Sequence, residues 1–436
     1  MKISVVGCGY LGAVHAACMA ELGHDVIGVD VDQAKIDALA EGRAPFFEPG
    51  LPEILLSAGA TGRLRFTTDM AEIADAEVHF IAVGTPQKAD SYAADLRFVE
   101  AAFAAIVPHL ADGAVVVGKS TVPVGTAGRL ADILAESAPQ ATLVWNPEFL
   151  REGFAIKDTL TPDRFVYGVP GGEAGERATG ILDEVYATAL ATGTPRIVTD
   201  YATAELVKVS ANAFLATKIS FINAMAEIAE ATGADVTQLA DAIGHDARIG
   251  RRFLNSGLGF GGGCLPKDIR AFRARGEELG LGASLAFLGE VDAINLRRRD
   301  RMVELTREAL GGTVTGKRIA ILGLAFKPDS DDVRDSPSLD VASRLHSEGA
   351  VVLVTDPEAI ETARRQHPEL SYVATVGEAV AQADVVLVLT EWMLYRELAP
   401  ADLEAAAGRI ILDGRNCLDP AQWRSAGWIY RSLGRP

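Results

Sequence analysis

The chain has 436 residues, enough for two or three domains. Its composition, with 49% hydrophobic and 23% charged residues, excludes a disordered or fibrous protein. The formal net charge of −18 argues against a nucleic-acid partner, although a local basic pocket could still hold a small anionic ligand. No apolar run approaches the roughly 20 residues that a membrane helix needs.

The first part of the chain predicts a parallel sheet. Short apolar runs recur as KISVVG, HDVIGVD, VHFIAVG, AVVVGKST and TLVWNPE, with helical segments between them. Fully apolar strands that alternate with helices indicate a parallel sheet covered on both faces. This pattern continues to roughly residue 195.

A nucleotide site is predicted at the end of the first strand. Gly7, Gly9 and Gly12 form G-x-G-x-x-G between a strand and a helix. They would allow the tight turn, the approach to a pyrophosphate and the packing of helix on strand. Asp30 ends the next strand, where its carboxylate could accept hydrogen bonds from a ribose and would repel a 2′-phosphate, so we expect NAD. The opening residues superficially resemble a secretion signal, but such a signal has no need of these glycines.

Two later loops follow strands of the same predicted sheet. Gly84 and Thr85 lie in one, and Ser120 and Thr121 lie in the other. Small and hydroxyl residues at the carboxyl ends of strands line the crevice that holds a cofactor, although both loops could be ordinary turns.

From Ala202 to Gly233, apolar residues three and four apart predict a helix of more than twenty residues, and a second helical stretch covers about 283–309. Long central helices commonly pack against a twin subunit, so we expect a homodimer or a higher homo-oligomer. A spine between the domains of a monomer is the alternative.

The strand pattern resumes at Lys317 with KRIAILGLAF, AVVLVTD, ADVVLVLT and GRIILDGR. The predicted fold class is therefore α/β, with two doubly wound Rossmann-like domains joined by a central long-helix region. We expect an NAD-binding domain at 1–200, a helical dimerisation domain at 201–310 and a second doubly wound domain at 311–436. The turn GLAFKPDSDD in the second lacks G-x-G-x-x-G, which makes it a poor dinucleotide site.

Cys264 is the candidate nucleophile. It stands in FGGGCLPKD, where the glycines would let substrate approach and leave backbone N–H groups as donors. Pro266 suits the first turn of a helix, which places Cys264 just ahead of the positive helix end, with Lys267 as a nearby cation. Both features stabilise a thiolate. Asp268, in the same first turn, could hold a lysine or a water.

The remaining cysteines Cys8, Cys18 and Cys417 are expected to be buried filler. Four scattered cysteines suit neither a disulfide framework nor a zinc cluster, so we expect no metal and a reducing cytoplasm.

No histidine lies in these motifs, so proton transfer must use lysine, carboxylate or water. Lys208 and Asn212 are four residues apart on the long helix and share a face. Glu148 and Glu152 in NPEFLREG would do the same if that segment is helical.

Together these motifs resemble the UDP-glucose and GDP-mannose dehydrogenases, which carry out NAD-linked four-electron oxidations. The resemblance covers nearly the whole chain through GCGYLG, STVPVGT, NPEFLREG, KVSANAFLATKISFIN, GFGGGCLPKD and GLAFKPDSDDVRDSP, in that order. One departure is Ala224, where many relatives have a glutamate, and it affects the expected packing of the helix rather than the chemistry.

The resemblance also implies roles for individual residues. Cys264 would be the covalent nucleophile, and Lys208, Asn212 and Asp268 would order a water and stabilise the oxyanion. Glu152 would be the base or water-orienting group, with Thr121 beside it. The implied cofactor contacts are Gly7, Gly9, Tyr10, Leu11, Gly12, Asp30, Lys35, Gly84, Thr85, Thr121, Glu152, Lys267 and Arg334.

The resemblance implies that the second doubly wound domain, at 311–436, binds the UDP-sugar. The implied sugar-nucleotide contacts come from several motifs, with Arg248 contributed by a twin subunit. They are Glu148, Phe149, Leu150, Glu152, Lys208, Asn212, Arg248, Phe253, Leu254, Asn255, Ser256, Gly257, Gly261, Cys264, Phe326, Lys327 and Arg415.

Alternatives to this interpretation differ in their chemistry. GCLPKD and the ANAFLATKISFIN helix favour UDP-glucose, with GDP-mannose or a UDP-N-acetylhexosamine as the alternative sugar. A two-electron hydroxyacid or 6-phosphogluconate type of dehydrogenase would need neither the thiol nor the second doubly wound domain. A non-enzymatic NAD sensor would reduce no cofactor.

Overall fold

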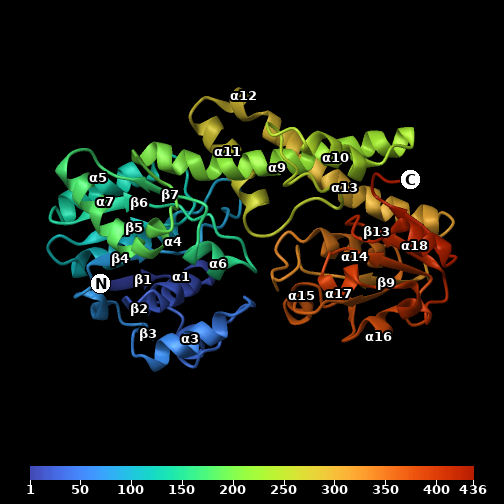
Figure 1. Cartoon of the computed structure of the whole chain (residues 1–436), viewed down its shortest axis with the longest axis horizontal. Coiled ribbons are helices and arrows are strands. Elements are labelled where there is room, and N and C mark those ends of the chain that lie inside the picture. Colours follow the sequence, from blue (N-terminus) through green and yellow to red (C-terminus); the bar gives the residue numbers. More distant parts are fainter. The chain divides into compact units, whose positions relative to one another are not determined.

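The computed structural model describes every residue from Met1 to Pro436, and the chain divides into two compact units. The first comprises Met1–Ala211 and Ala274–Gly280, and the second comprises Asn212–Arg273 and Leu281–Pro436. Each unit contains a sheet with helices beside it (Figure 1). The chain enters the second unit inside α9 (Tyr201–Thr232) and leaves it inside α11 (Leu265–Glu278).

The first unit has an eight-stranded sheet in the order β3-β2-β1-β4-β5-β6-β7-β8. The first six strands in that order are parallel and doubly wound, which confirms the prediction, whereas β6 and β7 pair antiparallel. The strands are β1 (Lys2–Val6), β2 (Asp25–Val29), β3 (Leu64–Thr67), β4 (Val78–Ile81), β5 (Val115–Gly118), β6 (Thr142–Trp145), β7 (Phe165–Gly168) and β8 (Arg196–Thr199).

Both faces of this sheet are buried. Successive residues of a strand point to opposite faces, so Val5 and Val117 lie in one apolar cluster while Val6 and Val116 lie in another. The helices that cover the faces are α1 (Tyr10–Glu21), α2 (Gln33–Ala40), α3 (Leu51–Ala60), α4 (Arg97–Ile106), α5 (Thr126–Ser137), α6 (Ala155–Leu160), α7 (Glu173–Val185) and α8 (Ala187–Ala191).

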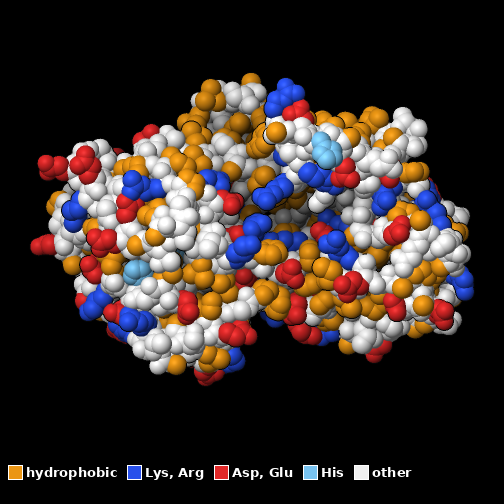
Figure 2. Space-filling view, in the orientation of Figure 1, with side chains coloured by type: hydrophobic (Ala, Val, Ile, Leu, Met, Phe, Trp, Pro, Cys, Tyr) orange, Lys and Arg blue, Asp and Glu red, His pale blue; other side chains and the backbone are white.

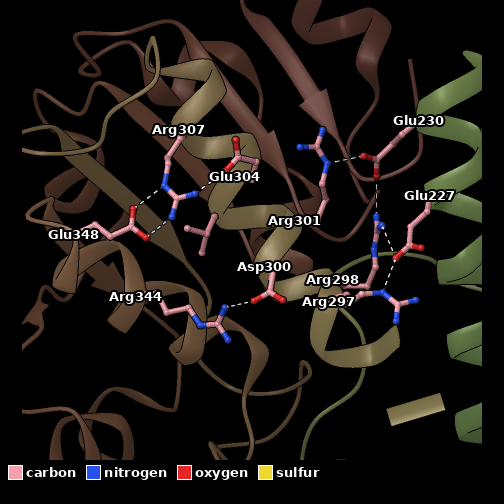
Figure 3. A pocket seen from close by; sticks show the side chains of 11 residues that line it. Glu227, Glu230, Arg297, Arg298, Asp300, Arg301, Glu304, Arg307, Arg344 and Glu348 are labelled. Atoms are coloured by element: carbon pink, nitrogen blue, oxygen red, sulfur yellow. Dashed lines mark hydrogen bonds and ion pairs between the residues drawn. The ribbon is translucent and has the colours of Figure 1, made fainter. Parts of the chain in front are cut away.

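The second unit begins with helices and ends with a six-stranded sheet. Its helical part contains the later residues of α9, then α10 (Val236–Gly244), most of α11, α12 (Gly282–Leu285) and α13 (Phe287–Ala309). The predicted long helix and the predicted stretch at about 283–309 are both confirmed. Arg298 and Arg301 of α13 donate to Glu230 of α9 over 2.9 and 2.7 Å. These residues line a pocket in which Arg307 also pairs with Glu348, and Arg344 with Asp300 (Figure 3).

The sheet of the second unit has the order β11-β10-β9-β12-β13-β14, and every pair is parallel. This repeats the strand order of the first six strands of the first sheet and confirms a second doubly wound domain. Its elements are β9 (Arg318–Leu322), α14 (Pro337–Ser347), β10 (Val351–Thr355), α15 (Ile360–Gln366), β11 (Ser371–Tyr372), α16 (Val376–Val380), β12 (Val385–Val388), α17 (Met393–Arg396), β13 (Ile410–Asp413), α18 (Pro420–Ser425) and β14 (Ile429–Ser432).

The surface of each unit carries charge of both signs. Figure 2 shows acidic, basic and apolar side chains interspersed over the visible face of both units. None of the helices has both the length and the apolar character that crossing a bilayer would require.

The buried His79 on β4 makes the fold sensitive to acid. Its ring is fully buried beside the Ser4 hydroxyl at 2.8 Å, and burial lowers the pKa of His79 from 6.5 to about 4. The fold needs the neutral ring, so the stabilising contribution is complete above pH 6.5 and is lost as the pH falls towards 4. We expect roughly 3 kcal/mol of unfolding free energy to be lost over that window from this group.

His79→Gln should therefore flatten the dependence of the unfolding free energy on pH between 6.5 and 4, as measured by urea denaturation at a series of pH values. His245→Gln, at an exposed position after α10, is the control. An unchanged slope in the His79 variant would contradict the assignment.

Candidate active site

The glycine loop after β1 has the form that a dinucleotide needs. Gly7 has φ +94°, and its N–H donates to Val29 O over 2.8 Å. A Cβ on Gly12 would lie 1.8 Å from Gly7 O, so only glycine lets α1 approach the strand this closely. Gly9 has open space where a Cβ would stand, and no side chain caps α1 there. The first-turn N–H groups of α1 are thus available to an anion.

Asp30 follows β2 and faces the same loop. Its carboxylate accepts from Cys8 N at 2.8 Å, Asp32 N at 3.1 Å and Lys35 Nζ at 2.8 Å. A carboxylate offers about four acceptor positions, so a ribose hydroxyl can still be accommodated. Lys35, an expected cofactor contact, lies beside Asp30 as its ion-pair partner.

The two loops after β4 and β5 are tied to each other. Thr85 Oγ1 donates to Thr121 O over 2.8 Å, and Ser120 Oγ donates to Val83 O over 2.7 Å. Since β1 and β4 are neighbours where the strand order reverses, these loops and the glycine loop lie at one switch point. Open space at Gly84 leaves room beside them, so the residues of this edge fit NAD.

The side chain of Tyr10, an expected cofactor contact, is engaged within the protein. Its hydroxyl donates to Glu48 and accepts from Gly153 N at 2.9 Å, so Tyr10 could offer a cofactor only its backbone. Glu48 is 3% exposed and also accepts from Gly153 N at 2.6 Å and Ala155 N at 2.7 Å. Sequence reasoning missed Glu48, which ties the loop before α6 to α1.

The NPEFLREG segment is a loop and not a helix, so Glu148 and Glu152 do not share a helical face. Glu148 Oε1 accepts from the N–H groups of Phe149 at 2.7 Å and Leu150 at 3.0 Å. Its Oε2 lies 3.0 Å from Lys119 Nζ, which is 3% exposed. The Glu148 carboxylate therefore organises the loop that carries Phe149 and Leu150.

Lys119 is a functional candidate that sequence reasoning missed. Its ammonium also donates to Asn146 Oδ1 at 3.0 Å and Tyr186 OH at 3.3 Å, and it lies 5.7 Å from the centroid of the Phe80 ring. The only sequence signal is a lysine at the end of the apolar run AVVVGKST, where a charge can be buried only if it is paired.

Lys208 reaches the same region of the first unit. Its Nζ lies 5.3 Å from the centroid of the Phe149 ring, so the structure brings these two predicted residues together. Three residues earlier, the buried Glu205 accepts from Gly125 N and Ala127 N at 2.7 Å each. Burial raises the pKa of Glu205, which caps the start of α5 and fixes the loop after Thr121. Glu205 was also missed.

In the second unit, Cys264 stands where the sequence predicted it. Helix α11 begins at Leu265, with Pro266 in its first turn, and Cys264 O accepts from Asp268 N over 2.9 Å. Cys264 is exposed, whereas Cys8 and Cys18 are fully buried and burial raises the pKa of each to about 12. Cys417 is partly exposed, and burial of its thiol raises its pKa well above the ordinary value.

The glycines before Cys264 are needed for packing within the protein. A Cβ on Gly261 would lie 2.4 Å from Asp335 O, one on Gly262 would lie 2.7 Å from the Phe326 ring, and one on Gly263 would lie 2.3 Å from the Arg334 guanidinium carbon. The expectation that these residues leave their N–H groups free is wrong for Gly262, whose N–H donates to Arg334 O over 2.8 Å.

Asp268 joins the thiol's helix to α9. Its Oδ2 accepts from Asn212 Nδ2 over 2.6 Å, and its Oδ1 accepts from Lys267 Nζ over 2.6 Å. Asp268 is only 3% exposed, so this is an ordered chain of polar groups beside Cys264. The expectation that Asp268 holds a lysine is confirmed for Lys267.

Only part of the FLNSG segment, residues 253–257, is exposed. Phe253 has φ +65° and is 37% exposed, but the Leu254 side chain lies in an apolar cluster and is 2% exposed. Asn255 Oδ1 accepts from Arg251, and Ser256 Oγ accepts from Asn416 Nδ2 over 3.0 Å. A Cβ on Gly257 would lie 2.6 Å from Gly414 O. Leu254 can therefore contact a ligand only through its backbone.

The expected basic contacts are each engaged within the protein. Arg415 donates to the carbonyls of Leu389 at 2.8 Å, Gly259 at 2.9 Å and Phe326 at 3.3 Å. Arg334 pairs with Asp332 at 2.7 Å, and the exposed Arg248 pairs with Asp246 at 2.7 Å. Lys327 Nζ lies 5.3 Å from the centroid of the Phe326 ring.

The second sheet is a poor dinucleotide site, and the residues after its first two strands show why. Gly323 and Asp356 occupy the topological positions of Gly7 and Asp30, after β9 and β10. Asp356, however, is filled by five donors, namely Leu324 N, Ala325 N, Glu358 N, Ala359 N and Trp392 Nε1. The carboxylate that would bind a ribose is used to hold the turn.

Sequence comparisons place the whole chain against one family. Residues 1–190 match the NAD binding domain of the UDP-glucose/GDP-mannose dehydrogenase family, residues 202–297 match its central domain, and residues 320–420 match its UDP binding domain. A UDP-glucose 6-dehydrogenase of Rhizobium meliloti (strain 1021) is 42% identical over 440 residues, which cover 100% of both chains.

Solved structures give the same picture. A UDP-glucose dehydrogenase from Pyrobaculum islandicum has a TM-score of 0.89 at 40% identity and covers 100% of this chain and 98% of its own. A UDP-D-ManNAc dehydrogenase from Pyrococcus horikoshii has a TM-score of 0.86 at 26% identity, with 100% and 99% covered.

Asp30→Ala should raise the dissociation constant for NAD about tenfold or more, because a charge-assisted hydrogen bond contributes roughly 1.5–3 kcal/mol. Isothermal titration calorimetry measures this, with Asp37→Ala on the exposed side of α2 as the control. Equal affinity in the Asp30 variant would move the ribose site elsewhere.

Proposed function

Because this chain belongs to the UDP-glucose/GDP-mannose dehydrogenase family, we propose that Cys264 is the covalent nucleophile in its four-electron oxidation of UDP-glucose to UDP-glucuronate. The chain is an NAD-dependent oxidoreductase. The observation that carries the proposal is the exposed thiol directly ahead of α11, whereas Cys8 and Cys18 are buried.

The assignment of the sugar rests on the relatives. Those named for UDP-glucose are 42% and 40% identical to this chain, whereas the one named for UDP-D-ManNAc is 26% identical. The UDP binding domain of the family covers residues 320–420, which supports a UDP-sugar as the substrate. We assign the three functional parts to 1–200, 201–310 and 311–436, as the sequence indicates.

The first unit would hold NAD. The pyrophosphate fits at Gly9 and the start of α1, and a ribose fits at Asp30. When bound, NAD accepts a hydride, and conversion of a primary alcohol to a carboxylate removes two hydrides in succession.

Cys264 supplies the covalent step. Once the first hydride has left, C6 is an aldehyde carbon, and the thiolate adds to it while the carbonyl electron pair moves to oxygen, giving a thiohemiacetal. Loss of the second hydride leaves a thioester. Attack by water then breaks the carbon–sulfur bond, releases the carboxylate with two protons and returns the thiolate. The bond to sulfur keeps the aldehyde from escaping between the oxidations.

We assign further roles in these steps to polar side chains. Asn212 and Lys208 donate to the oxyanion that develops on C6, each being worth about 3 kcal/mol in a typical site. Asp268 holds Asn212 over 2.6 Å and so fixes the direction of its amide. We assign Glu152 and Thr121 to the water that hydrolyses the thioester.

The product ratio separates this reaction from its alternatives. Our proposal requires two NADH for each sugar, a hydroxyacid type of dehydrogenase would give one, and an NAD sensor would give none. A panel of nucleotide sugars followed by absorbance tests the substrate and the ratio together. The small number of scattered cysteines supports a reducing, cytoplasmic location.

Cys264→Ser should abolish formation of UDP-glucuronate. The dissociation constant for NAD should stay within about twofold of the wild-type value, because the thiol is not part of the glycine loop or the Asp30 site that hold NAD. Cys417→Ser is the matched control, since a hydroxyl can also donate to Asp413. Wild-type turnover in the Cys264 variant would remove the covalent mechanism.

We also propose that the chain forms a homodimer through α9. Phe214, Phe221 and Ile228 recur every seventh residue of this helix and are 67%, 49% and 59% exposed. Residues at this spacing form one apolar stripe, which is typical of helices that pack against a second helix. A second copy of the chain would bury it.

Phe221→Asp should convert the dimer to a monomer in sedimentation velocity, because the carboxylate would be buried without a partner. Phe98→Asp, at a 51% exposed position of α4, should leave the assembly unchanged. A monomeric wild-type protein at micromolar concentration, or a dimeric Phe221 variant, would contradict the proposal.

A further inference from the structure

Asp335 packs against residues 261–264, which we call the thiol loop. Its carbonyl oxygen fills the position of a Cβ on Gly261, at 2.4 Å, and the carbonyl of the preceding Arg334 accepts from Gly262 N at 2.8 Å. The Arg334 guanidinium covers Gly263 in the same way. The backbone at 334–335 is thus the surface on which the residues immediately before Cys264 rest.

The Asp335 carboxylate is held between two arginines. Oδ2 accepts from Arg270 Nη1 over 3.1 Å, and Oδ1 accepts from Arg299 Nη2 over 2.8 Å. Arg270 belongs to α11, the helix that begins immediately after Cys264, and Arg299 belongs to α13. The Arg299 side chain is 6% exposed and the Asp335 side chain is 22% exposed, so salt screens this pair less than it screens a surface pair.

Further contacts fix the geometry of both arginines. Arg270 makes a bidentate pair with Asp292 of α13 at 2.8 and 3.0 Å, and Arg299 also donates to Asp335 O over 3.2 Å. Asp335 itself has φ +47°, a left-handed conformation that is unfavourable for most residues with a Cβ. The paired carboxylate offsets this cost and determines where the 334–335 carbonyls point.

We propose that Asp335 is a positioning residue for the covalent half of the reaction, fixing the thiol loop relative to α11 so that the Cys264 sulfur meets the aldehyde carbon. This rests on the proposed function. In this role the Asp335 carboxylate does not touch the substrate. It acts through the backbone at 334–335, which contacts Gly261 and Gly262. Without the Asp335 carboxylate, the Cys264 sulfur is held less firmly in position to attack the aldehyde carbon, whereas the first oxidation is largely unaffected.

Asp335→Asn tests the proposal, because asparagine keeps the shape and tolerates φ > 0 but loses the charge. The measurement is NADH formed per UDP-glucose consumed, together with aldehyde trapped by semicarbazide. We expect the ratio to fall from two towards one and the trapped aldehyde to rise about tenfold or more, since a misplaced nucleophile reacts far more slowly. A purely structural defect would lower the amount of active enzyme without changing this ratio.

Asp329→Asn is the matched control, because Asp329 lies in the same loop and also has a left-handed φ of +60°. It should retain two NADH per sugar. A ratio of two without trapped aldehyde in the Asp335 variant would overturn the inference and leave the proposed function intact. Retention of two NADH in Cys264→Ser would overturn the proposed function itself.

Arg270→Gln removes the same ion pair from the side of α11, together with the pair to Asp292, and serves if Asp335→Asn fails to fold. It should show the same release of aldehyde, while Asp335 keeps its bond to Arg299. A normal ratio in the Arg270 variant, or failure of both variants to fold, would count against a role in alignment.

Discussion

The packing of Gly261, Gly262 and Gly263 against the backbone and side chains of residues 326–335 is the contact on which the chemistry of the second unit depends. A Cβ on Gly261 would lie 2.4 Å from the Asp335 carbonyl oxygen, and Gly262 has φ +80°, so both positions favour glycine. The Arg334 guanidinium beside Gly263 is the mobile end of a side chain and could move aside. This packing fixes the path of the chain to the start of α11. That path leaves Cys264 exposed at a positive helix end, with Asp268 and Asn212 beside it.

The two doubly wound sheets show how one topology serves two different ligands. In the first, glycine at positions 7, 9 and 12 leaves the turn open and Asp30 retains acceptor capacity. In the second, Asp356 is saturated by donors from its own turn and from Trp392. The six strands of the second sheet repeat the order of the first six strands of the first sheet, so the difference in function comes from a few side chains at the carboxyl edge of each sheet.

Features set by neighbouring residues could be predicted from the sequence. The glycine loop, the long helix α9 and the position of Cys264 before α11 follow from local spacing, and the structure confirms each placement. The edge strand β8 was missed because its residues are largely exposed and lack an apolar run. The antiparallel pairing of β6 with β7 has no local signal either.

Features set by distant residues could not be predicted. The pairing of Lys119 with Glu148, the burial of Leu254 and the carbonyl contacts of Arg415 depend on where other strands and loops lie in space. Asp335 illustrates this most clearly, because its partners Arg270 and Arg299 come from helices dozens of positions earlier. Such charged pairs carry no periodicity that a sequence reveals.

In the proposed mechanism, the half-oxidised sugar becomes bonded to the Cys264 sulfur. Peptide mass spectrometry of the enzyme, acid-quenched during turnover of UDP-glucose with NAD, tests it directly. We expect an adduct of the sugar nucleotide on the peptide that contains Cys264, and no adduct when UDP-glucose is omitted. Formation of UDP-glucuronate at the normal rate with that cysteine unmodified throughout, or alkylated beforehand, would contradict it.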